Sequence, residues 1–147
     1  MKLSTRARYG TRALLDLALT QSNAPVHLKE IAQRQDVSLH YLEHIISPLI
    51  AAGIIRSTRG SRGGIQLNRP TEDIKLKEVI QLLEGSITPV ECIENPDSCS
   101  RSDACATRDF WGDVNKAIDD VLEATTLQDL VERQHEKDHS KQAMYHV

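Results

Sequence analysis

The chain has 147 residues, a formal net charge of −3, 3% aromatic residues and 3 cysteines. This length allows one sizeable core, or one small domain with an appendage. The longest apolar run, residues 49–55, is too short to span a bilayer, and the charged start lacks the apolar core of a signal peptide. The composition therefore argues against a membrane protein and predicts a cytoplasmic one.

Charge is divided unevenly along the chain. Residues 1–70 contain 10 Lys or Arg and 4 Asp or Glu, a balance of +6, whereas residues 71–147 contain 8 and 17, a balance of −9. A basic half joined to an acidic half is expected when one part binds a polyanion such as nucleic acid and the other does not. A chance segregation of solvated charges is the alternative for this feature alone.

Apolar residues at helical spacing predict three helices near the start of the chain. The first spans residues 6–20 and the second residues 28–34, while the third begins after the N-cap Ser38 and ends at Gly53. The last two helices and their tight turn predict a helix-turn-helix. We expect the core-facing residues of the three helices to be Ala13, Leu14, Leu17, Ala18, Ile31, Ala32, Leu42, Ile45, Ile46, Leu49 and Ile50.

A β-hairpin is predicted over residues 54–67, where β-prone ends flank a Gly-rich centre. The stretch lacks the lysine and the following helix of a nucleotide-binding loop, so we discount a phosphate cradle. A helix, a helix-turn-helix and a hairpin follow one another in the order of a winged helix. The predicted fold class is therefore mainly α with a small β-hairpin.

A winged helix offers two sets of DNA-binding side chains. The second helix of a helix-turn-helix enters the major groove, where Glu43 can accept from cytosine and His44 can bond to phosphate or base. Arginines at the hairpin tip suit a narrow minor groove. A solvated surface is the alternative for the helical positions. The candidate DNA-binding residues are Ser38, His40, Tyr41, Glu43, His44, Arg56, Arg59 and Arg62.

The second half of the chain predicts a further short helix over residues 76–83, a loop that contains the cysteines, and one long amphipathic helix. The long helix carries an apolar stripe, which a symmetry mate would cover in a homodimer, although packing on its own domain is the alternative. The stripe consists of Phe110, Trp111, Val114, Ala117, Ile118, Val121 and Leu122. We expect a winged helix-turn-helix domain over residues 1–85, a cysteine loop over 86–108, a dimerisation helix and a short following helix over 109–132, and a polar, frayed tail over 133–147.

All three cysteines, Cys92, Cys99 and Cys105, lie within one fourteen-residue stretch. Three thiols cannot pair off completely, so a metal site or redox chemistry is the economical explanation. Structural zinc prefers cysteine pairs with two residues between them, which are absent here, whereas an iron-sulfur cluster tolerates wider loops. A thiol sensor remains open, because the start of the long helix can lower the pKa of a thiol. The polar surroundings argue against inert buried thiols.

The stretch His135-Glu136-Lys137-Asp138-His139 matches the H-E-x-x-H pattern of zinc proteases. In those enzymes the helix is embedded in a core beside a substrate cleft, whereas this segment is polar on every face. We interpret the match as coincidental, with weak adventitious metal binding as its strongest consequence.

Together these features resemble the IscR-type transcriptional regulators of the Rrf family. The resemblance covers roughly residues 1–132 and lies in MKLSTRARYGTRALLDLA, LKEIAQRQDVSLHYLEHIISPLIAAGII, STRGSRGGIQL and the three cysteines. It implies a homodimeric repressor or activator, not an enzyme, that binds double-stranded promoter DNA. It also implies a 2Fe-2S cluster, or alternatively 4Fe-4S, on Cys92, Cys99 and Cys105. The alternative is a cluster-free regulator of the same fold that responds to thiol oxidation or docks a metabolic enzyme.

The chain departs from the pattern of this family at the fourth cluster ligand. Arg108 stands where 2Fe-2S members often carry histidine, and Arg8 stands where nitric oxide sensing members use an acidic residue of the partner. A guanidinium is a permanently charged group and a poor ligand. Asp103, Asp109, a histidine from elsewhere or a small molecule are the candidates that remain.

Overall fold

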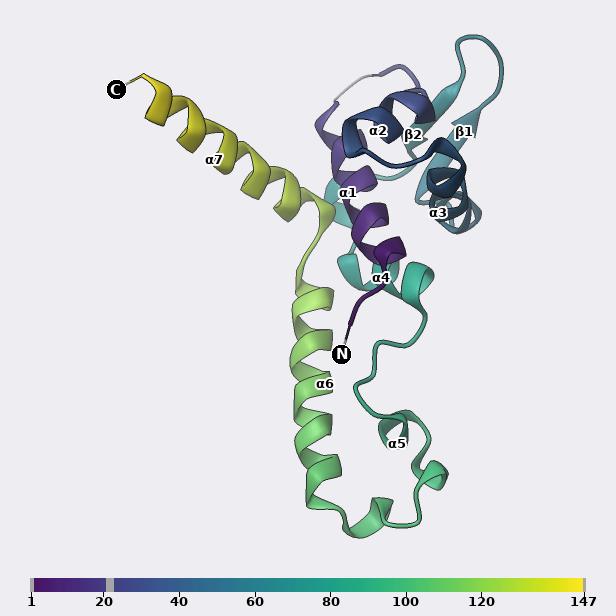
Figure 1. Ribbon diagram of the computed structural model, residues 1–147, viewed down its shortest axis with the longest axis vertical. Coiled ribbons are helices and arrows are strands. Elements are labelled where there is room, and N and C mark those ends of the chain that lie inside the picture. The colour runs from purple at the N-terminus through teal and green to yellow at the C-terminus, as the bar shows by residue number, and fades with distance from the viewer. Residues whose placement is uncertain (1, 21–22, 147) are drawn as a thin grey trace.

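The computed structural model describes residues 2–20 and 23–146 (Figure 1). The order of its elements confirms the predicted fold class, mainly α with one antiparallel hairpin. No helix within the described ranges is long and apolar enough to cross a membrane. The elements are α1 (Thr5–Leu19), α2 (Leu28–Gln35), α3 (Leu39–Ala51), β1 (Ile55–Thr58), β2 (Gly64–Leu67), α4 (Leu76–Glu84), α5 (Glu91–Glu94), α6 (Ala106–Ala124) and α7 (Leu127–Tyr145), with short 3-10 turns at Thr71–Asp73, Pro96–Ser98 and Ser102–Ala104.

Local capping fixes the helix-turn-helix formed by α2 and α3. The Ser38 side chain accepts a hydrogen bond from the backbone N–H of Tyr41 at 3.2 Å, which satisfies one of the free donors at the start of α3. Asp36 ends α2 in the left-handed conformation, with φ of 53°, which Asp adopts more readily than most residues. Only residues 36–38 separate the two helices, so the turn is as tight as predicted.

One hydrophobic core is formed by the four helices α1, α2, α3 and α4, the hairpin and the first turns of α7. All of the predicted core-facing residues are buried except Ile50, which is 36% exposed. Each residue turns a helix by about 100°, so Ile50 points away from its neighbour Leu49, which is fully buried. The largest fully buried side chains are Leu14, Ile31, Leu42, Ile45, Ile46, Leu49, Ile54, Ile55, Ile74, Val79 and Leu127.

The hairpin is attached to the segment that precedes α2. Val26 and Ile65 exchange two backbone hydrogen bonds, of 2.9 and 2.8 Å, which add a short third pairing beside β2. A Cβ on Gly64 would lie 2.4 Å from the Val26 carbonyl oxygen, and Gly64 has φ of +151°. Glycine is therefore required at this position, and the close approach holds the hairpin against the segment that precedes α2.

Backbone pairing also fixes the α6–α7 junction to the start of α4. The N–H of Leu76 donates to the Thr125 carbonyl at 2.9 Å, and the N–H of Leu127 donates to the Ile74 carbonyl at 2.8 Å. Lys77 forms an ion pair with Asp119 of α6 at 2.9 Å. The base of α6 is thus held by the core, while the rest of the helix extends away from it (Figure 1).

None of the residues of α6 is buried. Phe110 and Val121 are 56% and 64% exposed, and Trp111 packs edge-on against Phe110 with ring centroids 5.1 Å apart. The cysteine loop runs back along the first half of this helix, with α5 against α6. The predicted apolar stripe therefore exists and is only partly covered in the single chain. Val114, Ile118 and Leu122 are half-buried, whereas the exposed members are Phe110, Trp111, Ala117 and Val121.

α7 is longer than the sequence predicted. A short helix ending in a frayed polar tail from Arg133 was expected, but α7 continues to Tyr145. Its start has a complete capping box between Thr126 and Asp129, and polar pairs one turn apart, such as Gln134 with Asp138 at 2.9 Å, support its exposed part. Beyond Val131 the helix buries no residue, and it diverges from the rest of the molecule in Figure 1.

Candidate nucleic-acid interface and cysteine loop

The start of α3, including its N-cap, carries the five residues of this helix that the sequence predicts to contact DNA. Ser38, His40, Glu43 and His44 are exposed, while Tyr41 is half-buried. The Ser38 hydroxyl already caps the helix, and the Tyr41 hydroxyl lies 2.8 Å from that of Thr5 on α1. The groups of this surface that remain most open are therefore the two imidazoles and the Glu43 carboxylate.

The two imidazoles of α3 contact each other. Nε2 of His40 and Nε2 of His44 lie 3.3 Å apart, and the rings are nearly perpendicular, with centroids 4.6 Å apart. One turn of helix separates the two residues, so their side chains project from the same face. Sequence reasoning named both residues but did not anticipate that they would meet.

The arginines of the hairpin do not all lie on one side. All three are exposed, and Arg59 and Arg62 lie in the turn between β1 and β2. Arg56 lines a groove with Leu17 and Ala18 of α1, whereas its neighbour Ser57 lines a different groove with Glu43. Adjacent strand residues point to opposite faces. The structure therefore groups Arg59 and Arg62 at the tip and places Arg56 apart from α3.

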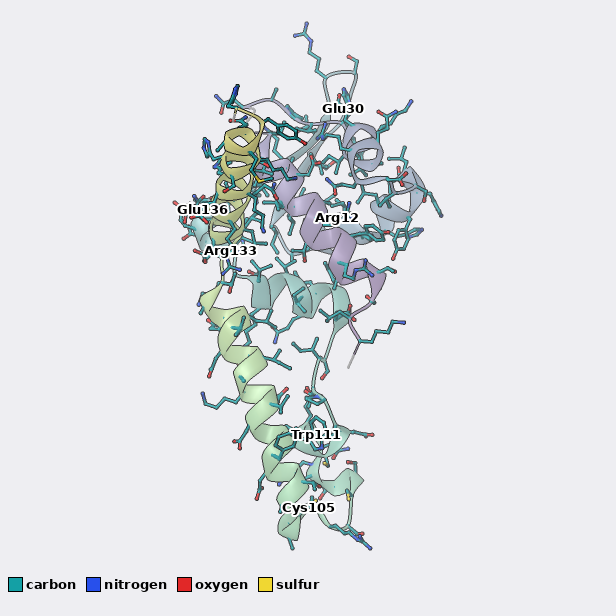
Figure 2. The ribbon with its side chains drawn as sticks, turned by 60° about the vertical axis from the view of Figure 1, so that its left-hand side comes forward. Arg12, Glu30, Cys105, Trp111, Arg133 and Glu136 are labelled. Carbon is teal, nitrogen blue, oxygen red and sulfur yellow. The ribbon has the colours of Figure 1, made fainter. Side chains whose placement is uncertain are left out.

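The cysteine loop is a chain of short turns at the far end of the molecule from the hairpin (Figure 1). Cys92 lies in α5 and is half-buried, Cys99 follows a 3-10 turn and is exposed, and Cys105 precedes α6 and is half-buried. Figure 2 shows Cys105 at the tip of α6, remote from Arg12 in α1. No residue of α5 or of the two 3-10 turns is buried.

Arg108 organises this loop. Its Nε donates to the Cys92 carbonyl at 3.0 Å, and its Nη1 donates to the Ser102 carbonyl at 3.4 Å. The guanidinium therefore joins two parts of the loop to the first turn of α6. The sequence identified Arg108 only as a poor metal ligand. Its bridging role was not predictable, because backbone carbonyls are present at every residue and carry no sequence signal.

Cys105 is the thiol whose acidity is altered. Its Sγ lies 3.1 Å from the Thr107 hydroxyl, and the hydrogen bond from that hydroxyl lowers the pKa of Cys105, followed by that from the backbone N–H of Arg108. The first turn of a helix favours negative charge, which acts in the same direction. Cys105 therefore has more thiolate character at neutral pH than an ordinary cysteine.

The three thiols share a loop but do not converge on one point. Within residues 2–20 and 23–146, no group of three or more His, Cys, Asp or Glu side chains is arranged to hold a metal ion. Asp103, Asp109 and Arg8 are all exposed. His135 and His139 also lie exposed on α7, where Glu136 is marked in Figure 2, so the H-E-x-x-H match is not embedded in a core.

A helix-turn-helix with an exposed recognition surface and a hairpin tipped by arginines defines a winged-helix DNA-binding protein. The Rrf2 family model, described as an iron-dependent transcriptional regulator, matches residues 3–133. The chain therefore belongs to the Rrf2 family, whose members are DNA-binding transcriptional regulators rather than enzymes.

Relatives of known sequence and structure agree with this assignment. Protein rrf2 of Nitratidesulfovibrio vulgaris is 49% identical over 131 residues, covering 89% of this chain and 87% of the relative. The structure of CymR (YrzC), the global cysteine regulator of B. subtilis, matches with a TM-score of 0.77 and 38% identity, covering 90% of this chain and 98% of the other. T. potens IscR matches with a TM-score of 0.76 and 37% identity, covering 93% and 90%. The predicted resemblance to IscR-type regulators is confirmed.

Proposed function

We propose that two copies of the chain bind promoter DNA together, and that an iron-sulfur cluster held by Cys92, Cys99 and Cys105 sets their affinity for it. The observation that carries this proposal is the position of the cysteine loop. It folds against α6, the helix that carries the exposed apolar side chains Phe110, Trp111 and Val121. A change in the loop would therefore act directly on the surface that pairs the two copies.

The DNA-binding part of the proposal rests on α3 and the hairpin tip. Glu43, His40 and His44 lie exposed on the helix that enters the major groove in winged-helix proteins. Arg59 and Arg62, exposed in the turn between β1 and β2, would meet phosphates or a narrow minor groove beside it. These side chains would read one half-site, and the second copy would read the other.

The homodimer part rests on α6. Trp111 is 38% exposed, and its neighbour Phe110 and the more distant Val121 are more exposed still. Large apolar side chains gathered on one helix face mark an interaction surface, and a two-fold axis allows the same face to cover itself. A dimer also suits operators with two half-sites, one helical turn or a multiple of it apart.

The cluster part rests on the donor set. Three thiols within one loop suit iron and sulfide, and the pKa of Cys105 is lowered, which favours the thiolate that binds metal. The family description names iron, and an IscR structure is among the relatives. The thiols do not converge in the described conformation, so binding requires the loop to tighten. The loop turns bury no residue, so tightening leaves the core intact.

A bound cluster would supply a redox-sensitive charged centre. A change in the state of the cluster would be transmitted through α6, because Arg108 joins the loop to the first turn of that helix. At the other end, the backbone bonds of Leu76 and Leu127 fix the base of α6 to α4. A movement of the loop would thus change the angle between the two DNA-binding domains, and with it the fit to paired half-sites.

Anaerobic reconstitution with iron and sulfide tests the cluster. The wild-type chain should acquire a visible chromophore with bound iron and inorganic sulfide, and replacing any one of Cys92, Cys99 or Cys105 by Ser should abolish or severely weaken it. The double variant His135→Gln/His139→Gln serves as the matched control and should retain the chromophore. Asp103→Ala and Asp109→Ala then test the fourth ligand. Tight zinc binding without any uptake of iron and sulfide would overturn the cluster assignment.

Thiol oxidation is the second candidate, and the exposure of Cys99 and the position of Cys105 at the start of α6 favour it. The CymR relative, a global cysteine regulator, belongs to the same family. In this candidate, peroxide oxidises two loop thiols to a disulfide and is itself reduced to two molecules of water. Metal-free protein should then lose or gain DNA affinity on peroxide treatment and recover it with a dithiol reductant. An unchanged affinity would exclude this candidate.

A further inference from the structure

We infer that His40 and His44 of α3 form a binding site for a divalent transition-metal ion such as Zn²⁺ or Ni²⁺, separate from the cysteine loop. Both imidazoles are exposed on one face of a regular helix, and their Nε2 atoms lie 3.3 Å apart. Neutral imidazole is a common ligand for these ions. Both residues belong to one regular helix and lie one turn apart, so no loop has to close to form the site.

The separation of the two nitrogens matches the separation that a metal ion requires. Bonds of about 2.0 to 2.1 Å from zinc to two histidine nitrogens, set at the tetrahedral angle, place those nitrogens about 3.3 to 3.4 Å apart. The observed 3.3 Å lies in this interval. In the metal-free pair one ring donates a hydrogen bond to the other. On binding, the hydrogen bond is lost, and the proton of the donating ring moves from Nε2 to Nδ1. Both Nε2 lone pairs then turn toward an ion that lies to one side of the line between the two nitrogens.

The site would have two protein ligands. Among the described residues no third His, Cys, Asp or Glu side chain is placed to complete a metal centre, so water would fill the remaining positions. Such an open site is weaker than a four-ligand structural site and remains accessible to other ligands. Glu43, exposed on the same helix, adds a negative charge that favours a cation nearby.

The second histidine pair of the chain provides an internal comparison. His135 and His139 have the same spacing on α7, yet among the described residues no hydrogen bond or ring contact joins them, unlike His40 and His44. The inference therefore rests on the observed approach of two atoms and not on spacing alone. An ion on α3 would also occupy groups that the proposed function assigns to DNA, but the site itself does not depend on DNA binding.

Metal titration of the full-length protein without DNA tests the inference, so its outcome is independent of the proposed function. The three thiols are alkylated, and the parent carries His135→Gln/His139→Gln to remove the other pair. Equilibrium dialysis with Zn²⁺ should find one bound ion per chain. His40→Gln or His44→Gln should weaken Zn²⁺ binding by at least about tenfold. Removing a group that merely orients a metal ligand already costs about that much, and here a ligand itself is removed.

Glu43→Gln is the matched control, because it changes the same surface but no ligand, and it should keep the stoichiometry of one. Both histidines are exposed, so their replacement leaves the core intact, and circular dichroism verifies the helices. In NMR spectra, the Nε2 signals of His40 and His44 should shift together as Zn²⁺ is added. A parent that binds no Zn²⁺, or histidine variants that bind it as the parent does, would overturn the inference.

Discussion

α4 and α6 are both amphipathic helices, but they differ in what covers their apolar faces. Val79 and Leu83 of α4 are 0% and 4% exposed, because α1 and α3 pack against them. Phe110 and Val121 of α6 are 56% and 64% exposed. The same 3.6-residue periodicity thus produces a core helix in one region and an open face in the other. Periodicity reveals which side of a helix needs a partner, and not where that partner comes from.

This difference separates the molecule into a DNA-binding domain with a buried core and an arm whose apolar stripe is partly exposed. The domain contains most of the buried apolar residues, whereas the arm contains the three thiols and the uncovered stripe. In the proposed homodimer a second copy covers this arm, so a change near its surface would alter assembly without disturbing the fold of the domain.

The largest effect is expected from truncating a core side chain of α3. Leu42 is fully buried, and Leu42→Ala should lower the free energy of unfolding by about 2 to 5 kcal/mol, because apolar burial is reduced and a cavity is left behind. Urea denaturation followed by circular dichroism measures this change. The reduction should be similar at low and high protein concentration, because the cavity lies within one chain.

Val121→Ala is the comparison on α6. If α6 pairs two copies, the change that Val121→Ala makes to the free energy of unfolding should depend on protein concentration. The reason is that assembly and folding are linked by mass action. A concentration-independent reduction of the size seen for Leu42→Ala would contradict the division between the two regions.

A charge on the stripe should separate the two copies. Ile118→Glu or Val121→Glu would bury an unpaired carboxylate in the proposed interface, at a cost of several kcal/mol, and should yield monomers or insoluble protein. Lys116→Gln alters an exposed side chain of the same helix that forms an ion pair with Asp120, and it should leave the assembly unchanged. Sedimentation velocity measures the outcome. Soluble dimers of both glutamate variants, with unchanged DNA affinity, would show that the stripe has another role.

DNA binding should belong to the complete domain and not to the arm. Arg59→Ala should weaken binding to all sequences and should reduce the slope of log affinity against log salt by about 0.9 for each phosphate that the arginine neutralises. Arg133→Ala removes an exposed arginine from α7 and should change neither quantity. Fluorescence anisotropy at several salt concentrations distinguishes these cases. Affinity that is indifferent to salt would contradict the proposed interface.

Glu43→Ala should instead change which sequences are preferred. A carboxylate accepts a hydrogen bond from cytosine but does not attract a polyanion, so discrimination at one base pair should fall by about 1 to 3 kcal/mol. Competition assays with single-base operator variants measure this change. Equal weakening on every sequence would mean that Glu43 does not face the bases.

The sequence was most informative where structure depends on neighbouring residues. Ser38 as a cap and the Gly-rich hairpin are local signals, and both elements were predicted correctly, as was the long helix that follows the cysteines. The extent of α7 was underestimated, since its exposed half depends on several weak polar pairs such as Gln134 with Asp138. The hydrogen bonds of Arg108 depend on how the loop folds in space, and no residue pattern predicts them.

The smallest expected effect lies at the junction where the domain meets the arm. The Thr126 hydroxyl accepts from the Asp129 N–H at 3.2 Å, while the Asp129 carboxylate accepts from the Thr126 N–H at 2.8 Å. Thr126→Ala should therefore lower the free energy of unfolding by about 1 kcal/mol. Thr125→Ala is the control. It removes a hydroxyl that donates to the Val121 carbonyl at 2.7 Å, and it should lower the free energy of unfolding by less.

The pH dependence of this cap has a definite sign. The bond from the Thr126 backbone N–H, followed by that from its hydroxyl, lowers the pKa of Asp129. The ionised Asp129 carboxylate therefore contributes its full stabilisation above about pH 4, the pKa of an aspartate in the unfolded chain. That stabilisation is lost as pH falls through the lower pKa that Asp129 has in the folded chain. Asp129→Asn should flatten the fall in stability below about pH 4 while leaving Leu127 and Val131 buried. An identical acid profile in wild type and variant would show that the cap does not hold the junction, and that the backbone bonds to α4 suffice.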